Sequence, residues 1–282
     1  MKLLIIPSAF FSFILFSCKK DANTTSSSNS ERLDSAVSQF VTATKITDEK
    51  LTVSLDSLVK RARRHGWWEL CNAIYPFAGG TSETCKYNLK DPRDLDAAFR
   101  LTFLNNPAVG TAGVTFDGST QYADTHLTPS STLSLNDTHF SIYVPSSGHG
   151  GNHGITGDVH PSPYFEIEDS DTTQGWVGLN STSDELISYS NTDKYFLLSR
   201  TGPNSSDISL YHNSTQTGGL SQASSALPTV SVYLGAANDG TNNPTQFSAD
   251  TLQFVSIGSG INSTMASAMY TDIFNFVTSK GY

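Results

Sequence analysis

The segment Tyr164–Gly178, YFEIEDSDTTQGWVG, contains the pattern on which the fold prediction rests. Glu166 and Glu168 alternate with apolar residues, which is the period of a β-strand with two different faces. Polar residues at 169–173 then separate this strand from a second one near Trp176. Similar segments recur at 113–116, 140–144, 195–199, 208–211, 230–234 and 252–257. Because no helical pattern separates them, we predict a mainly β fold of the antiparallel sandwich or jelly-roll type.

Three segments have the period of a helix instead. The clearest runs from Thr47 to His65, where Thr47 is in position to cap the first turn and Gly66 follows the last. A second lies at 262–279, and a shorter one at 34–43. The sequence therefore predicts a β domain with an N-terminal and a C-terminal helix.

The composition is polar, but it contains few charges. Charged residues make up 15% of the chain, hydrophobic residues 37%, and the formal net charge is -9. A protein that binds nucleic acid needs a basic face for the phosphates, so this charge argues against that class of partner. The apolar and aromatic residues suffice for a sizeable core.

The start of the chain differs from the remainder. Lys2 is followed by an apolar run to Phe16 that is too short to span a bilayer as a finished helix. The stretch Leu15–Cys18 resembles the lipobox of bacterial lipoproteins, and the resemblance implies cleavage before Cys18 and acylation of it, with palmitate as one chain. Residues 19–31 have the polar, low-complexity composition of a tether.

An acylated Cys18 would attach the protein to a membrane through lipid alone. The residues Lys19-Lys20-Asp21 are similar to the start of lipoproteins that some Gram-negative bacteria display on the outer surface. We therefore expect an outer membrane lipoprotein on the cell surface or the periplasmic face. The expected organisation is a signal peptide at 1–17, the lipidated cysteine and tether at 18–31, a helical segment at 32–66 and the β domain at 67–282.

Two further cysteines, Cys71 and Cys85, bear on how the domain is stabilised. In an exported protein an isolated pair predicts a disulfide. Closing a loop of this length would stabilise the fold by roughly 3 kcal/mol. The alternative is a pair of buried free thiols, because spacing alone does not establish disulfide geometry.

Several other motifs carry a family resemblance. They are YPFAGGT (75–81), NLKDPRDLDAAFR (88–100), VTFDG (114–118), YAD (122–124), SLND (134–137), VYLGA (232–236) and FVSIGSGINSTMASAMYTDIFNF (254–276). Together they resemble the concanavalin A-like (laminin G-type) jelly-roll domains of bacterial surface proteins and phage virion proteins. The resemblance covers about residues 45–282 and implies two curved antiparallel sheets. Members include glycan-binding modules, adhesion domains and glycoside hydrolases, so the fold alone does not imply one function.

Within 88–100, opposite charges lie close together along the chain. A structural ion-pair cluster explains these residues better than a catalytic role does. They are Asp91, Arg93, Asp94, Asp96 and Arg100. Asp94 is also in position to cap a short helix that runs to Arg100.

Glu166 and Glu168 are the candidate catalytic residues. On a strand they point to the same face, as the two carboxylates of a retaining glycosidase do. The hydrolases of this fold have a Glu-x-Asp-x-x-Glu pattern, and Asp171 occupies the third position here. The second and third acids therefore differ in length from that pattern, which would displace groups that catalysis needs in place. The alternative is an acidic, solvated strand end.

Two groups of residues in the sequence are candidate metal ligands. A loop between predicted strands contains candidate ligands for Zn or Cu, namely His149, His153, Asp158 and His160. The alternative is a surface loop that happens to be rich in histidine. Calcium, which is common in the family that the chain resembles, has candidate ligands in Asp169, Asp171 and Asp239. Apart from calcium we expect no cofactor.

A sugar site combines an aromatic ring, which covers the apolar face of a pyranose, with polar groups at its edges. Trp176 and Tyr164 are the candidate ligand-binding residues. Three more rings are candidates, although any of them can equally belong to the core: Tyr189, Tyr195 and Tyr211. We predict a surface-displayed lipoprotein with a non-catalytic binding domain for glycan recognition or adhesion, with a polysaccharide or surface glycan as its partner. The alternatives are a glycoside hydrolase and a structural or assembly module.

Overall fold

The structure is a computed structural model that describes residues 32–145, 151–156, 163–169, 173–190, 192–217 and 219–280. The side chains of 151–156 and of Asp169 are not described. Contacts divide the chain into Met1–Arg32 and the compact unit Leu33–Tyr282. The proposed signal peptide, Cys18 and the tether lie outside the described residues.

The three predicted helices are present. They are α1 (Ser35–Thr44), α2 (Glu49–His65) and α5 (Ser263–Ser279). The prediction that Thr47 caps α2 is wrong, because the Asp48 carboxylate accepts the N–H groups of Lys50 and Leu51 at 2.8 and 3.1 Å. Gly66 ends α2 as predicted, in a left-handed conformation that glycine adopts at no steric cost. No helix in the described part of the chain is long and apolar enough to span a membrane.

The strands form two large antiparallel sheets. The six-stranded sheet has the order β1 (Cys71–Tyr75), β18 (Phe254–Gly258), β6 (Thr138–Tyr143), β11 (Tyr195–Arg200), β12 (Ile208–His212) and β13 (Thr215–Thr217). The seven-stranded sheet has the order β10 (Glu185–Ser188), β9 (Gln174–Ser181), β8 (Tyr164–Asp169), β7 (Gly151–Thr156), β14 (Tyr233–Leu234), β5 (Tyr122–Asp124) and β2 (Thr102–Leu104). The mainly β prediction is therefore confirmed.

Shorter elements complete the described residues. Two small sheets have the orders β17 (Thr251–Leu252), β4 (Gly113–Thr115), β3 (Ala108–Gly110) and β15 (Ala237–Asn238), β16 (Pro244–Thr245). The short helices are α3 (Ser82–Cys85) and α4 (Pro129–Thr132), and the 3-10 turns are η1 (Trp68–Leu70), η2 (Asp96–Ala98) and η3 (Ser205–Asp207). The predicted strand at 230–234 is shorter than expected, since only its last two residues pair.

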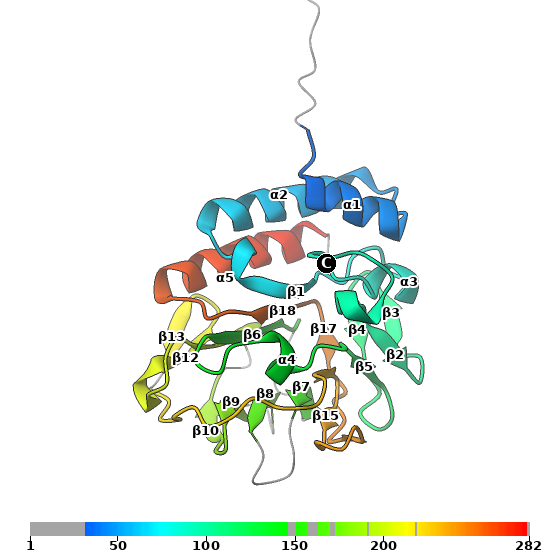
Figure 1. The fold of residues 1–282 in the computed structure, drawn as a ribbon. Helices are drawn as coiled ribbons and strands as arrows, with labels where there is room; N and C mark the ends of the chain where they lie inside the picture. Colours follow the sequence, from blue (N-terminus) through cyan, green and yellow to red (C-terminus); the bar gives the residue numbers. More distant parts are fainter. Residues whose placement is uncertain are drawn as a thin grey trace, which may run out of the picture. The chain divides into compact units, whose positions relative to one another are not determined.

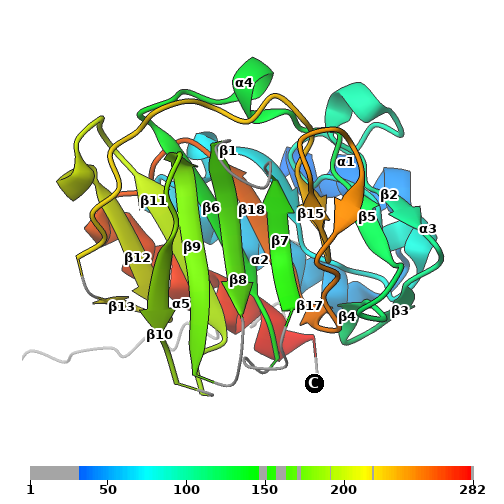
Figure 2. The same cartoon turned by 90° about the horizontal axis from the view of Figure 1, so that it is seen from below.

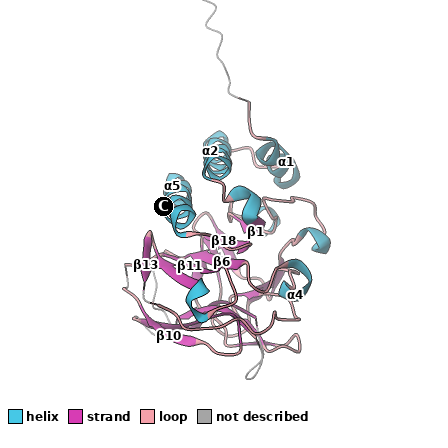
Figure 3. Cartoon of the chain, turned by 60° about the vertical axis from the view of Figure 1, so that its left-hand side comes forward, coloured by secondary structure: helices cyan, strands magenta, loops and turns pink. Residues whose placement is uncertain are grey.

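The two large sheets share one hydrophobic cluster. Phe140 on β6 and Phe165 on β8 are both fully buried in it, with ring centroids 5.3 Å apart. The cluster also contains Ile142, Leu198, Ile167, Val177 and Leu179. Each such side chain stabilises the fold by about 1.5–3 kcal/mol on burial, so this cluster contributes to the packing of both sheets, which Figure 3 shows in magenta.

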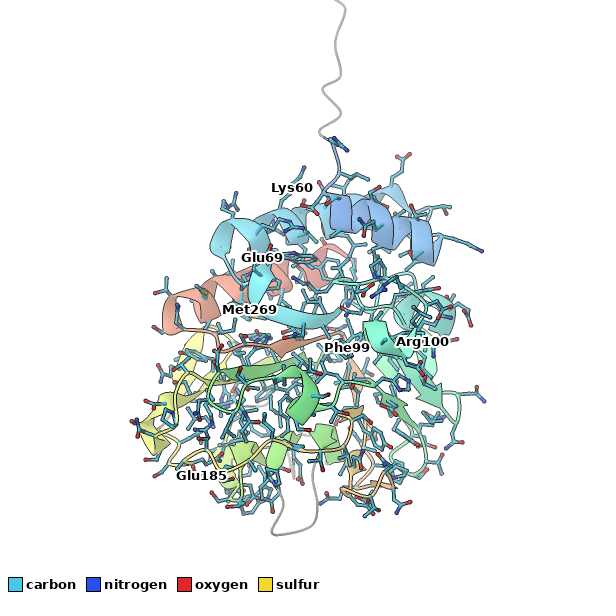
Figure 4. The ribbon with its side chains drawn as sticks, in the orientation of Figure 1. Lys60, Glu69, Phe99, Arg100, Glu185 and Met269 are labelled. Atoms are coloured by element: carbon cyan, nitrogen blue, oxygen red, sulfur yellow. The ribbon has the colours of Figure 1, made fainter. Side chains whose placement is uncertain are left out.

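The opposite face of the six-stranded sheet packs against helices. Tyr195 on β11 and Phe254 on β18 belong to a second cluster with Leu58 of α2 and Phe276 of α5. Figure 1 shows α5 and α2 stacked over β1 and β18, and Figure 4 labels Met269 on α5 within this layer. The six-stranded sheet is therefore covered on both faces.

The seven-stranded sheet has a different environment. Figure 2 shows β7, β8 and β9 in front, with α1, α2 and α5 behind them. None of these three helices covers the outward face of this sheet. We call this uncovered face of the seven-stranded sheet the outward face.

The predicted disulfide is absent. Cys71 and Cys85 are both buried free thiols. Cys71 belongs to the cluster beneath the helices and Cys85 to the cluster between the sheets, so the packing holds them in different places. Each thiol donates to a backbone carbonyl instead, Cys71 to Trp67 at 3.4 Å and Cys85 to Ala78 at 3.5 Å.

The charged segment 88–100 does form ion pairs. Asp94 binds Lys86 at 3.1 Å and Arg100 at 3.2 Å, and Arg100 also contacts Asp96. Figure 4 marks Arg100 and the neighbouring Phe99 in this segment. The predicted helix cap at Asp94 is wrong, because its carboxylate is taken up by these cations and only the η2 turn forms.

Candidate ligand-binding face

Strand alternation places the candidate residues of β8 on the outward face. Phe165 and Ile167 point into the core between the sheets. Because successive side chains of a strand point to opposite faces, Tyr164, Glu166 and Glu168 point outward. The prediction that both glutamates share one face is confirmed.

The neighbouring strand β9 adds an aromatic ring. Val177 is in the core, so Trp176 and Gly178 share the outward face with the glutamates. The register pairs Glu168 with Trp176, and Glu166 with Gly178. The structure therefore brings Tyr164, Glu166, Glu168 and Trp176 together, which are the two predicted catalytic and the two predicted ligand-binding residues.

These side chains differ in accessibility. Trp176 and Glu168 are half-buried, whereas Tyr164 is 9% exposed and Glu166 only 4%. A ligand on this face would therefore meet the indole and Glu168 before it met Glu166.

Gly178 permits this arrangement. A Cβ atom at this position would lie 2.5 Å from Cβ of Tyr164 and 3.6 Å from Oε1 of Glu166. The first distance is far below van der Waals contact, so the tyrosine packs directly over the glycine backbone. We did not identify Gly178 as a site residue from the sequence, although a glycine inside a strand is a signal of close approach.

Acidic groups surround Glu166. Burial raises the pKa of Glu166 well above its ordinary value, and the charges of Glu168 and Asp184 raise it further. Burial also raises the pKa of Tyr164 to about 12, with Asp184, Glu166 and Glu168 adding to the effect. Asp184, just before β10, is a second residue of this group that sequence reasoning missed. These conditions favour the neutral carboxylic acid form of Glu166.

An apolar side chain extends the surface beside Trp176. Leu186 on β10 pairs with Trp176 across the sheet and is 49% exposed. Together the indole and this leucine form an apolar patch on one side of the glutamates. Sequence reasoning did not single out Leu186.

A second aromatic group lies further across the same sheet. Ala123 of β5 and Leu234 of β14 point into the core, so Tyr122 and Tyr233 point outward. Their ring centroids are 4.7 Å apart. Burial and then the Asp124 carboxylate raise the pKa of Tyr233 to about 12. Tyr122 and Tyr233 therefore lie near a carboxylate, that of Asp124, as Trp176 of β9 lies beside Glu168 of β8.

The other candidate rings belong to the core. Tyr189 packs edge-on against Phe196 at 5.5 Å in the cluster between the sheets. Tyr195 and Tyr211 lie in the cluster beneath the helices. These three tyrosines are therefore excluded from the outward face.

The candidate metal ligands are mostly beyond what the structure describes. His149, Asp158, His160 and Asp171 lie outside the described residues, and the side chains of His153 and Asp169 are not described. Asp239 accepts hydrogen bonds from the Thr241 hydroxyl and N–H at 2.7 and 2.8 Å, which lower its pKa to about 2. Within the described ranges, no three His, Cys, Asp or Glu side chains are grouped as a metal site requires. The Zn, Cu and Ca sites stay predictions.

A cysteine and a histidine meet inside the six-stranded sheet. The Sγ atom of Cys71 lies 3.9 Å from Nε2 of His139, which also contacts the Ser256 hydroxyl at 3.0 Å. Burial lowers the pKa of His139 to about 4 and raises that of Cys71 to about 12. A nucleophilic cysteine needs the opposite shifts and access to substrate, so this pair is part of the core.

Comparisons with known proteins do not assign this chain to a family. No protein-family model matches the chain, and no curated protein matches it. Among solved structures it is similar to a mutant Trypanosoma rangeli sialidase displaying trans-sialidase activity, at 12% identity and a TM-score of 0.48, covering 79% of this chain and 39% of that one. It is also similar to domain 4 of AbnA, a GH43 extracellular arabinanase from Geobacillus stearothermophilus in complex with arabinotriose. There the identity is 14% and the TM-score 0.39, covering 71% and 98%.

A third similarity is to Trypanosoma rangeli sialidase in complex with the inhibitor DANA, at 12% identity and a TM-score of 0.40, covering 60% of this chain and 29% of that one. The chain thus spans well under half the length of these sialidases. With TM-scores below 0.5, these similarities assign neither a fold family nor an activity to the chain.

Proposed function

We propose that the domain is a concanavalin A-like jelly roll whose outward face binds a glycan without catalysing a reaction. The observation that carries this proposal is the placement of Trp176 beside Glu168 on a sheet face that α1, α2 and α5 leave uncovered. A pyranose has an apolar face and a rim of hydroxyl groups. The indole and Leu186 offer an apolar surface, and the carboxyl groups accept hydrogen bonds from hydroxyls.

The fold proposal is supported by the arrangement of the sheets. Six and seven antiparallel strands share one hydrophobic cluster, and the strands within each sheet come from distant parts of the sequence. For example, β18 near the carboxyl end lies between β1 and β6. Strand neighbours that are distant in the sequence are consistent with the Greek-key connections of a jelly roll and support the proposal.

Binding of the full-length protein, purified in detergent, to a glycan array tests the function. For a glycan that binds, we expect Trp176→Ala to weaken affinity about tenfold or more, since a stacked aromatic contributes ~1.5 kcal/mol or more with its buried area. Phe274→Ala is the matched control, because Phe274 is a partly exposed ring on α5, away from this face. If the wild-type protein binds no glycan, or if both variants lose affinity equally, the proposal is wrong.

A second candidate, a glycoside hydrolase, is favoured by one observation. Glu166 has a raised pKa and lies two residues from a second carboxyl on the same face, as a general acid beside a nucleophile would. Its 4% exposure argues against this role, because the acid must reach the glycosidic oxygen. Release of reducing sugar that Glu166→Gln abolishes would establish the hydrolase. A structural or assembly module would show neither binding nor hydrolysis.

We propose also that the protein is a lipoprotein, acylated at Cys18 and displayed on the outer membrane. The apolar run up to Phe16 and the polar residues 19–31 support this. Labelled palmitate should enter the wild-type protein and not Cys18→Ser. Protease treatment of intact cells should remove the domain if it is displayed on the surface. Label retained in Cys18→Ser would contradict the proposed anchor.

A further inference from the structure

A cavity lies where the start of α2, the end of α5, α3 and the turn between β3 and β4 come together. Its volume is about 510 Å³, which is in the range of small-molecule binding sites. Polar side chains in its lining include Lys45, Thr47, Asp48, Lys50, Thr111 and Lys280. Figure 1 shows α2 and α5 at the end of the domain away from β8, β9 and β10, so this cavity is separate from the outward face.

The charges of the protein are distributed unevenly along the chain. Residues 32–66 contain seven lysine and arginine residues and four acidic ones, whereas residues 67–282 contain seven and twenty. Three of these fourteen cations line the one cavity. Because most of the domain is acidic, its field favours the approach of an anion to this end and opposes it elsewhere.

Two of the three lysines are available to a ligand. Lys45 and Lys50 are exposed, and within the described residues neither ammonium group forms an ion pair. Lys50 lies in the first turn of α2, where a cation adds to the positive end of the helix dipole, so helix stability does not explain it. Asp48 is the only acid among the described lining residues, and its carboxylate already accepts the N–H groups of Lys50 and Leu51. The lining therefore has more positive than negative charge.

The third lysine is fixed in place by the fold. Nζ of Lys280 lies 3.0 Å from the carbonyl oxygen of Pro76 and 3.4 Å from those of Phe77 and Gln253. Carbonyl groups are neutral, so these hydrogen bonds position the ammonium group without neutralising it. A group that is ordered before the ligand arrives adds little to the entropic cost of binding.

The residue types in the lining indicate the class of anion. Arginine matches a planar carboxylate through two parallel hydrogen bonds, whereas lysine acts as a point charge that suits the several oxygens of a phosphate. The described lining contains three lysines and no arginine. Thr47 and Thr111 add hydroxyl groups, and Ile46 and Leu51 form an apolar wall against which an organic group can pack.

We propose that this cavity binds a small molecule that bears a phosphate group. Lys45 and Lys50 bind the phosphate oxygens, and Lys280 contributes a fixed positive charge in the wall. Two sources offer this chemistry, a soluble phosphomonoester and the phosphodiester headgroup of a lipid. The inference goes beyond the proposed glycan binding and does not depend on it.

Isothermal titration calorimetry of the full-length protein in detergent tests the proposal with four probes. Glycerol 1-phosphate is a monoester, glycerophosphoglycerol has the diester of a lipid headgroup without its acyl chains, glycerate has a carboxylate instead, and glycerol has no charge. We expect at least one of the phosphates to bind about tenfold or more tightly than glycerate and glycerol at low salt. The phosphate that binds more tightly identifies the source, and added salt should weaken its binding.

Charge-matched variants locate the binding site. Lys45→Gln and Lys50→Gln should each weaken binding of the preferred phosphate about tenfold, and both positions are exposed, so the fold should persist. Lys194→Gln is the control, because it removes the same charge from an exposed position just before β11 that is not part of the cavity lining. It should leave the affinity unchanged.

Three results would overturn the proposal. The first is that neither phosphate shows saturable binding. The second is that glycerate or glycerol binds as tightly as the phosphates, which would remove the assignment of ligand class. The third is an equal loss of affinity in Lys50→Gln and Lys194→Gln, because binding would then reflect net charge and not the cavity.

Discussion

Lowering the pH should destabilise this domain through His139. The ring is fully buried on β6, with Nδ1 2.5 Å from the carbonyl oxygen of Ser259 and Nε2 3.0 Å from the Ser256 hydroxyl. Burial lowers the pKa of His139 to about 4, although the Ser259 carbonyl and Asp137 act in the opposite direction. The folded protein therefore keeps this imidazole neutral under conditions in which the unfolded chain protonates it.

The sign and size follow from linkage between protonation and folding. Well above about pH 6.5 both states hold a neutral His139, and the group costs no stability. As the pH falls toward 4, the unfolded state takes up the proton first and is favoured. For pKa values of about 4 and 6.5, the loss in free energy of unfolding reaches about 2.5 kcal/mol near pH 4.5.

Urea denaturation followed by tryptophan fluorescence measures this loss at about pH 7.5 and 4.5. His139→Gln is the comparison, because glutamine retains a donor and an acceptor but does not titrate. The pH-dependent contributions of all other groups to the free energy of unfolding cancel when the two proteins are compared. Burial also lowers the pKa of His212, which adds to the acid loss, while the raised pKa of Glu166 acts in the opposite direction. If the wild-type protein and His139→Gln lose the same stability on acidification, the reasoning is refuted.

Further predictions concern the outward face, the helix layer and the thiols. Gly178→Ala should displace Tyr164, cost about 1–3 kcal/mol and weaken glycan binding, whereas Gly219→Ala should not, since a Cβ there meets open space. Denaturation and binding of both variants check this, and equal effects would contradict the packing. Asp272→Asn should lower the free energy of unfolding by about 1–3 kcal/mol, because it weakens the contacts of α5 with Trp67 and with His65 of α2. Thermal denaturation measures this loss, and an unchanged melting temperature would refute it. A reductant should leave the melting temperature unchanged, because a native disulfide would otherwise contribute roughly 3 kcal/mol.

Local patterns predicted the elements of the fold well, because they depend on neighbouring residues. The alternation around Glu166 indicated a strand with a polar face, and the apolar stripe before Gly66 indicated a helix. Errors in the helix caps occurred where several groups compete for one interaction. Thr47 and Asp48 can both cap a helix, and the position of the first turn selects the aspartate. Asp94 was expected to cap a helix, but nearby cations took up its carboxylate.

The sequence by itself determined that this is a mainly β domain with helices at both ends, because hydrophobic periodicity reflects which faces must be buried. It also determined that Glu166 and Glu168 share a face, because that follows from the period of a strand. Only the tertiary structure decided that Trp176, Tyr164 and the distant Asp184 meet there, since strand register is not encoded by any one segment. It likewise decided that Cys71 and Cys85 remain apart, because the packing of each against its own hydrophobic cluster, and not their spacing in the chain, sets where the thiols lie.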